Sequence, residues 1–264
     1  MTARIVDGMR HLAGREPTRV ERAVAREVPV ALVHDGATHA VMMASPADLE
    51  DFAVGFALSE GVIATIADLR ELEVIEHERG FELRMWLAPG VGRVAAERRR
   101  LIAGPTGCGL CGVESIEAAA KPARLVTAAG PVTAGDVSAA VATLAGAQQV
   151  GRLTRATHAA GLYLPGQGLV ALREDVGRHN ALDKLIGAAA RGGLAPTSGI
   201  VAITSRVSIE MVQKTAVLGC PVLVAVSAPT DLAIATAEAA GIALVAVARE
   251  DGFEVFTHAD RVIG

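Results

Sequence analysis

Residues 200–226 read IVAITSRVSIEMVQKTAVLGCPVLVAV, and this stretch decides the fold. Two short apolar runs, at residues 200–204 and 222–226, enclose a segment with helical spacing of its apolar residues from 207 to 218. Neither run shows the alternation of apolar and polar residues that is typical of a strand with one solvent-exposed face. Uninterrupted apolar strands are typical of sheets that helices cover on both faces. The stretch therefore predicts a strand–helix–strand unit of a three-layer α/β domain.

The same alternation continues on both sides of this unit. The further elements predicted for this half are an Ala-rich helix over 133–147, a hairpin of strands 159–164 and 169–173, a helix over 178–190, a helix over 232–240 and a strand over 242–247. Turn residues at 165–168, Pro-Gly-Gln-Gly, close the hairpin. We place the start of this domain near residues 113–125, which divides the chain into 1–120 and 121–264.

The first half has a mixed α+β pattern. Strands are predicted at 28–33 and 38–43 around Asp35-Gly36, and at 74–75 and 81–87 around Arg79-Gly80. Between the two hairpins, Ser45-Pro46 is expected to open a helix, with Ser as the cap and Pro at the first helical position, and Gly61 is expected to close it. This half is therefore predicted to form a smaller α+β domain.

Composition excludes several classes of protein. The chain has 264 residues, of which 51% are hydrophobic and 20% charged, with a formal net charge of −4. These values exclude disorder and collagen, and the charge argues against a nucleic-acid partner. Three cysteines cannot all be paired, which favours thiols in a reducing compartment. No apolar stretch approaches the roughly 20 residues of a membrane span, so we expect no membrane partner and a cytoplasmic location.

The glycine-rich loop at 104–112, GPTGCGLCG, carries the sharpest chemical signal. Cys108 and Cys111 are close enough to share one loop, and the thiolate form is the nucleophile. A short helix predicted over 113–119 would favour that thiolate through its N-terminal end, and the arginines at 98–100 would do so if they fold back. The loop is suited to carrying sulfur between partners.

Other interpretations of these cysteines stay open. A structural zinc site needs four ligands, and no second Cys pair exists; His158 and Cys220 would complete one only by tertiary accident, so no structural metal is expected. A thioredoxin-like motif would follow a strand, whereas helix and loop precede this one. Two inert thiols are the plainest alternative. Cys220, before Pro221, is predicted to lie in the core.

Two polar clusters interrupt the apolar half. In the first, at 173–186, Arg178, His179 and Asn180 start a helix and offer donors to a phosphate or a purine edge. Asp183 and Lys184 are expected to face solvent, and Asp175 to cap the helix. In the second, at 204–214, three residues open the next helix: Ser205, Arg206 and Ser208. The two helix starts are predicted to form one pocket wall; simple capping with solvated charges is the alternative.

Three segments together resemble one family. GCGLCG at 107–112, EDVGRHNALDK at 174–184 and SRVSIEMVQK at 205–214 are similar to the formate dehydrogenase accessory sulfurtransferases, the FdhD family. VAVSAPT at 224–230 and FTH at 256–258 extend the resemblance, which covers most of the chain beyond roughly the first 20 residues.

The resemblance implies a cytidine-deaminase-like C-terminal domain and a homodimeric sulfur carrier. Such a carrier takes persulfide sulfur from a cysteine desulfurase and passes it to the bis-molybdopterin guanine dinucleotide cofactor of formate dehydrogenase. The persulfide-forming cysteine falls on Cys108 and the second motif cysteine on Cys111. A guanine-nucleotide segment falls on six residues: Val247, Ala248, Arg249, Glu250, Asp251 and Gly252. His158 lies at the expected edge of the same pocket.

The sequence departs from the family pattern at Arg155. Members commonly carry Thr-Gly-Gly or Thr-Gly-Ala before His-Ala-Ala, whereas residues 154–160 here read TRATHAA. Arg155 either blocks a close approach of the backbone to the ligand or supplies a phosphate contact. The fold also hosts nucleobase deaminases, but their chemistry needs a His-x-Glu shuttle and residues 158–160 are His-Ala-Ala, so deamination is rejected. A chaperone that binds the cofactor without carrying sulfur remains the alternative.

Overall fold

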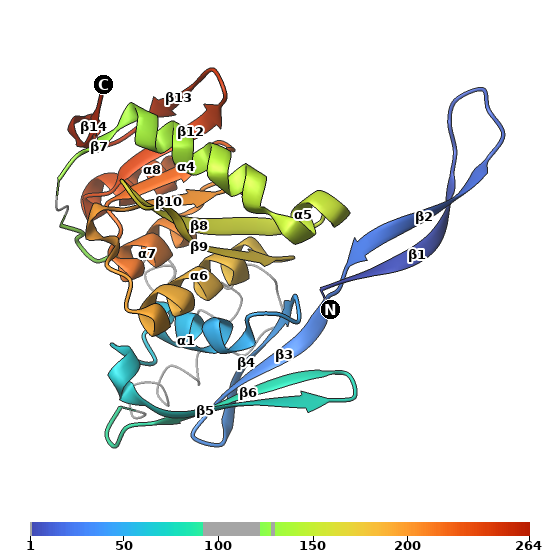
Figure 1. The fold of residues 1–264 in the computed structure, drawn as a ribbon. Helices are drawn as coiled ribbons and strands as arrows, with labels where there is room; N and C mark the ends of the chain where they lie inside the picture. Colours follow the sequence, from blue (N-terminus) through green and yellow to red (C-terminus); the bar gives the residue numbers. More distant parts are fainter. Residues whose placement is uncertain (1, 92–121, 128–129) are drawn as a thin grey trace.

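The computed structural model describes residues 2–91, 122–127 and 130–264. Figure 1 shows two unequal parts joined through packed helices, with a long two-stranded arm at the N-terminus. The strands are β1 (Ala3–Arg10), β2 (Thr18–Ala25), β3 (Val28–His34), β4 (Ala37–Ala44), β5 (Leu69–His77), β6 (Gly80–Leu87), β7 (Val132–Thr133), β8 (His158–Leu164), β9 (Gly168–Asp175), β10 (Ile200–Ile203), β11 (Val222–Ala225), β12 (Ala243–Arg249), β13 (Gly252–Val255) and β14 (Val262–Ile263). The α-helices are α1 (Leu49–Ser59), α4 (Ala134–Ala147), α5 (Gln149–Thr154), α6 (Arg178–Gly192), α7 (Ile209–Leu218) and α8 (Asp231–Ala240).

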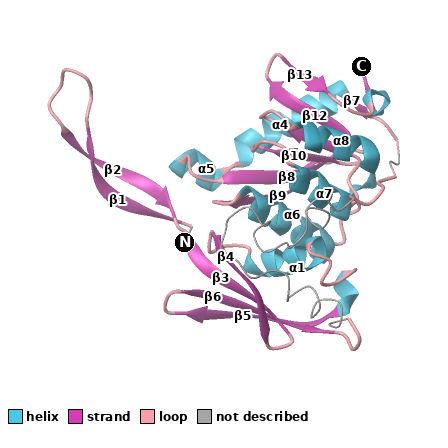
Figure 2. Cartoon of the chain, turned by 180° about the vertical axis from the view of Figure 1, so that it is seen from behind, coloured by secondary structure: helices cyan, strands magenta, loops and turns pink. Residues whose placement is uncertain are grey.

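The larger part is built on a six-stranded sheet with the order β13-β12-β11-β10-β8-β9. β10, β11 and β12 are parallel, and the other three strands are antiparallel to their neighbours. Helix α4 covers one face (Figure 1), and α6, α7 and α8 cover the other (Figure 2). The three-layer α/β domain predicted from the sequence is confirmed.

The strands of this sheet are apolar throughout because each face is covered. Val201 and Ile203 of β10 pack on the side of α6, α7 and α8. Ile200 and Ala202, between them in the chain, pack on the side of α4. Successive side chains of a strand point to opposite faces, so both sets are buried.

The smaller part is a four-stranded sheet with the order β4-β3-β6-β5, packed on α1. The two predicted hairpins are confirmed: β3 pairs with β4 and β5 with β6, both antiparallel. A parallel pairing of β3 with β6 joins them. Phe52 and Phe56 of α1 fill the space between helix and sheet, together with Leu32 and Leu83.

The start of α1 differs from the prediction. Ser45 and Pro46 do not open the helix; it begins at Leu49, and Asp48 is the N-cap residue with φ 52°. The physical reason lies in tertiary contacts, because the backbone and hydroxyl of Ser45 bond to Asp175, Val176 and Lys184. The position of Gly61 just beyond the helix agrees with the prediction.

Helices α1 and α6 cross with their backbones in contact. A Cβ atom added at Gly55 of α1 would lie 1.7 Å from the carbonyl oxygen of Asp183. One added at Gly187 of α6 would lie 1.9 Å from the carbonyl oxygen of Asp51. Only glycine at both positions permits this approach, which brings the smaller sheet and the larger domain together. The predicted boundary at 113–125 falls mostly on residues outside the described ranges.

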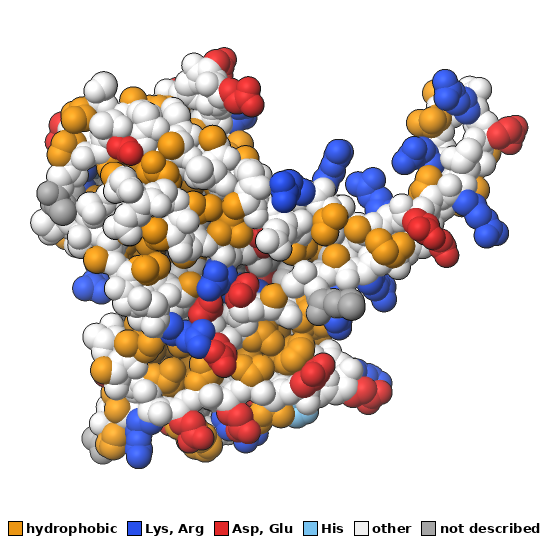
Figure 3. All heavy atoms as spheres, viewed as in Figure 1, with side chains coloured by type: hydrophobic (Ala, Val, Ile, Leu, Met, Phe, Trp, Pro, Cys, Tyr) orange, Lys and Arg blue, Asp and Glu red, His pale blue; other side chains and the backbone are white. Residues whose placement is uncertain are grey.

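The arm formed by β1 and β2 was not predicted. The two strands pair antiparallel from Ala3 with Ala25 to Arg10 with Thr18. Figures 1 and 2 show the arm projecting from the body, and Figure 3 shows Lys and Arg side chains along it. Its apolar residues Ile5 and Met9 are exposed. Because neither face is covered, no regular apolar alternation marks these strands in the sequence.

Candidate functional site

The polar segments that the sequence singles out meet at one edge of the six-stranded sheet. Because β10, β11 and β12 are parallel, the segments that follow them leave the sheet at the same edge. β8 is antiparallel to β10 and therefore begins at this edge, at His158. β9 ends opposite it, where Asp175 pairs with His158. The starts of α6 and α7 and the segment 247–252 are thus brought to a common edge.

A compact group of side chains occupies the middle of this edge. His179 Nε2 of α6 lies 3.8 Å from Glu210 Oε2 of α7, and Ser208 Oγ donates to the same carboxylate oxygen at 2.5 Å. His179, together with Ser208, lowers the pKa of Glu210 to about 2, against the opposing effect of burial. Burial lowers the pKa of His158, and the nearby Arg178 and His179 lower it further. The group thus brings His158, His179 and Glu210 together beside the guanidinium of Arg178, at the start of α6.

Two buried nitrogen atoms in this group lack hydrogen-bond partners within the described ranges: Arg178 Nε and His179 Nε2. The arginine atom always carries a proton, and a buried donor left unsatisfied costs about 1–3 kcal/mol. An anion at the start of α6 would supply acceptors, and the helix dipole would favour its charge. These residues therefore fit a phosphate group.

Asn180 and Ser205, which were predicted to bind the nucleotide, are buried and hydrogen-bonded within the protein. Asn180 is 3% exposed, and its amide nitrogen donates to Met43 O at 2.8 Å and Asp175 Oδ1 at 3.0 Å. Ser205 is buried, and its hydroxyl donates to the carbonyl of Arg206 at 3.0 Å. Both side chains are used inside the protein. Arg206, on the same loop, has an exposed side chain.

The segment 247–252 covers the end of β12, the turn at residues 250–251 and the first residue of β13. Val247 has φ 53°, at an irregularity in the pairing of the two strands. Arg249 folds back and donates to the carbonyl oxygens of Val226 and Ala248. Glu250 and Asp251 are exposed at the tip of the turn. Their carboxylates are therefore accessible at the edge, whereas the guanidinium of Arg249 is hydrogen-bonded to Val226 in the loop after β11.

The cysteines divide between described and undescribed residues. Cys108 and Cys111 lie outside the described ranges, as do the arginines at 98–100 and the helix predicted over 113–119. Cys220 is fully buried, and burial raises the pKa of its thiol to about 12. The prediction that Cys220 is a core residue is confirmed.

Behind the edge lies a set of buried charges that sequence reasoning missed. Asp183 and Lys184 were expected to face solvent, but they are 2% and 0% exposed. Lys184 Nζ donates to Asp175 Oδ2 at 2.7 Å and to the carbonyl of Ser45 at 2.9 Å. The expectation of solvent exposure is wrong because α1 packs against α6 and covers this face of the helix.

A second buried pair joins α6 to α7. Lys214 Nζ donates to both carboxylate oxygens of Asp183, at 2.7 and 2.9 Å, and Ser59 Oγ of α1 donates to Asp183 Oδ1 at 2.6 Å. Burial opposes the charge of Lys214, but Asp183 and Glu60 outweigh it and raise its pKa. A lysine within the apolar run MVQKTAVL is the signal that could have revealed this pair.

A third group lies at the rim of the same interface. Asp51 of α1 accepts from Arg173 Nη2 at 2.6 Å and from Arg191 Nη1 at 2.5 Å. Arg191 also pairs with Glu50. Figure 3 shows cationic and anionic side chains gathered where the two parts of the molecule meet. Charge pairs thus flank the contact between α1 and the larger domain at several points.

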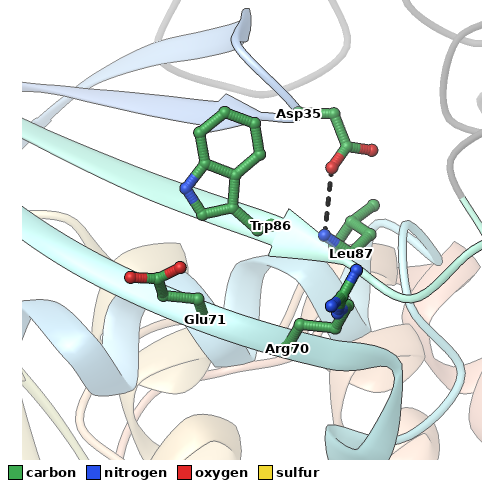
Figure 4. Close-up of a pocket in the computed structure, with 5 residues that line it drawn as sticks. All are labelled: Asp35, Arg70, Glu71, Trp86 and Leu87. Atoms are coloured by element: carbon green, nitrogen blue, oxygen red, sulfur yellow. Dashed lines mark hydrogen bonds between the residues drawn. The ribbon is translucent and has the colours of Figure 1, made fainter.

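One shallow pocket lies away from this edge, on the smaller sheet. It is lined by Asp35, Arg70, Glu71, Trp86 and Leu87, and Asp35 Oδ1 accepts from the Leu87 amide (Figure 4). None of the residues predicted for the site lines it. Within the described ranges, the side chains form no group of three potential metal ligands, and no helix is long and apolar enough to cross a membrane.

Comparisons with known proteins agree on one family. The model of the FdhD/NarQ family matches residues 25–263. A protein of Agrobacterium fabrum named Sulfur carrier protein FdhD is 56% identical over 248 residues, 94% of this chain and 92% of that protein. One of the same name from Brucella abortus is 51% identical, over 96% and 95% of the two chains. A crystal structure of a formate dehydrogenase accessory protein from Desulfotalea psychrophila has a similar fold, with a TM-score of 0.77, 24% identity and complete coverage of both chains.

Proposed function

This chain belongs to the FdhD/NarQ family, and on that basis we propose that it is a sulfur carrier required for formate dehydrogenase activity. In this proposal Cys108 takes persulfide sulfur from a cysteine desulfurase and delivers it to the bis-molybdopterin guanine dinucleotide cofactor, which is cargo. The observation that carries the proposal is the Cys108–Cys111 pair in a chain whose curated relatives are named sulfur carrier proteins. The proposed setting is a reducing cytoplasm, and the proposed assembly is a homodimer.

The proposed transfer consists of two exchanges at sulfur. The Cys108 thiolate attacks the terminal sulfur of the desulfurase persulfide; a new S–S bond forms on Cys108, and the desulfurase thiolate leaves. The Cys111 thiolate then attacks the inner sulfur of the Cys108 persulfide and displaces hydrosulfide to the cargo. The two cysteines supply the two electrons and end as a disulfide, which an external thiol must reduce before the next cycle.

The sheet edge supports the proposed binding of the cargo. Arg178 Nε and His179 Nε2 are buried and accept or donate no hydrogen bond within the described ranges, which suits phosphate oxygens, although Glu210 Oε2 lies 3.8 Å from His179 Nε2. Glu250 and Asp251 are exposed at the neighbouring turn and offer carboxylates to the amino group of a guanine. The proposed role of these residues is to hold the guanine dinucleotide while sulfur is delivered.

The proposal is tested by incubating the protein with cysteine desulfurase and cysteine, followed by mass spectrometry of its peptides. We expect the mass of one added sulfur atom on the peptide that contains Cys108, and none in a Cys108→Ala variant. Cys220 is an internal control, because its buried thiol, with a pKa near 12, is protonated and shielded. Sulfur found on Cys220 contradicts the proposal, and so do loop cysteines that carry neither an added sulfur nor a Cys108–Cys111 disulfide.

The same variant separates a carrier from a chaperone that only binds cofactor. Arg178, His179 and the 247–252 turn would serve either function. A carrier loses formate dehydrogenase activation in cells that express Cys108→Ala, although GDP binding by the variant is unchanged. Full activation by this variant would favour the chaperone.

A further inference from the structure

Asp175 is a fully buried carboxylate whose two oxygen atoms face different parts of the protein. Oδ1 accepts from the Gly177 amide at 2.8 Å and from Asn180 Nδ2 at 3.0 Å, both at the start of α6. Oδ2 accepts from the Ser45 amide at 2.9 Å and from Lys184 Nζ at 2.7 Å. The carboxylate thus connects the residues just before Arg178 and His179 to the end of β4.

We infer that Asp175 is a positioning residue, which holds the start of α6 so that Arg178 and His179 bind the phosphates of a guanine nucleotide. This inference rests on the proposed function, because it assigns a role at the same edge. In this inference Asp175 does not touch the nucleotide, because both of its carboxylate oxygens accept hydrogen bonds from donors of the protein.

The surrounding bonds show why this carboxylate controls the helix start. Asn180 donates a second time, to the carbonyl of Met43, and the Val176 amide donates to Ser45 Oγ at 3.2 Å. Residues 43–45 and 175–180 therefore bond in both directions, with Asp175 at the centre. The N-cap residue of α6 is Gly177, which has no side chain with which to cap the helix. The position of the first turn consequently depends on Asp175.

The second buried pair provides a matched control. Asp183 and Lys214 also form a buried carboxylate–ammonium pair that α1 contacts, through Ser59. Asp183 lies further along α6, and the hydrogen bonds of this pair, to each other and to Ser59, do not include residues 176–180. Removing both charges of either pair leaves no uncompensated buried charge, so both double variants are expected to fold.

The experiment compares Asp175→Asn/Lys184→Met with Asp183→Asn/Lys214→Met. GDP affinity is measured by isothermal titration calorimetry at one salt concentration, below the melting temperature of every variant. Asn at position 175 turns an amide donor towards the Ser45 amide, which also donates. The hydrogen bond between these two residues is therefore lost, and the start of α6 is no longer held against residues 43–45. We expect GDP binding to weaken about tenfold in the first variant and to change less than about twofold in the second.

Amide hydrogen exchange distinguishes a local change at the start of α6 from a general loss of stability, which would raise the exchange rates along the whole helix. Residues 176–181 should exchange faster in the Asp175 variant alone, while the rest of α6 keeps its protection. If the first variant fails to fold, Ser45→Ala replaces it in the experiment, because this substitution retains every charge. We expect it, too, to weaken GDP binding.

The outcomes separate this inference from the proposed function. If GDP binds the wild-type protein and both double variants equally, or weakens equally in both, the positioning role is overturned and the nucleotide site stands. If the wild-type protein binds no GDP, the proposed nucleotide site is overturned, and the role assigned to Asp175 with it.

Discussion

Glu210 shows how a single residue of the site is tuned by its neighbours. Its carboxylate accepts from Ser208 and lies beside His179, which holds its pKa at about 2. The anion is thereby kept next to the buried nitrogen atoms of the first turn of α6.

Replacing Glu210 by Gln should destabilise the protein by about 1–2 kcal/mol at pH 7, after allowance for solvent screening. The folded-state pKa is lowered, so the stabilisation is complete above the ordinary value of 4.5 and is lost as the pH falls towards about 2. Urea denaturation of both proteins across this range measures the difference. The same substitution at exposed Glu254 controls for net charge, and a difference that grows towards acid pH contradicts the prediction.

Arg155 lies at a backbone position that suits glycine. It ends α5 with φ 55°, a left-handed conformation that costs an ordinary residue roughly 1–2 kcal/mol. A glycine at this position would adopt the same conformation without that cost. Its side chain is exposed, which agrees with the hypothesis that Arg155 contacts a phosphate of the ligand.

At the scale of elements, the crossing of α1 and α6 organises the molecule. Gly55 and Gly187 allow the two backbones to touch, and buried charge pairs flank the crossing. Buried pairs of this kind contribute little net stability, but breaking one leaves a charge without a partner. The crossing therefore specifies one arrangement of the two helices.

Gly187→Ala should destabilise the protein by about 3 kcal/mol or more, because the new Cβ would overlap the backbone of Asp51. Gly146 of α4 is the matched control: a Cβ there meets nothing within 4 Å. Gly146→Ala should be neutral or should stabilise by about 0.5–1 kcal/mol. Chemical denaturation of both variants tests the comparison, and equal effects would refute the role of the crossing.

At the scale of the whole molecule, the arm stands apart from the packed layers. The family match begins at residue 25, just where β2 ends. β1 and β2 have no buried residue, and β2 contacts the body at α5. Two-stranded ribbons add little stability by themselves.

Removal of residues 2–22 should therefore leave one cooperative unfolding transition, with a melting temperature within about 3 °C of the full chain. Differential scanning calorimetry of both proteins in the same buffer measures this. A loss of more than about 10 °C would show that the arm is part of the core.

Local pattern was enough to predict most elements of the larger domain. The strands at β10, β11 and β12 and the helices between them follow from apolar runs and caps, and the Cys loop and the polar helix starts are legible as motifs. Local pattern misplaced the start of α1, because Ser45 has a stronger partner 130 residues away. It also missed the arm, whose strands lack a buried face.

The amino-acid sequence by itself determined the layers of the larger domain and the membership of a sulfur-carrier family. Only the tertiary structure decided the surroundings of the charged motif residues. Asp183 and Lys184 look solvated in isolation, because one helix by itself leaves every face open to water. Packing α1 against α6 through two glycines removes that water, and each charge then has a partner on another element: Asp175 of β9 for Lys184, and Lys214 of α7 for Asp183.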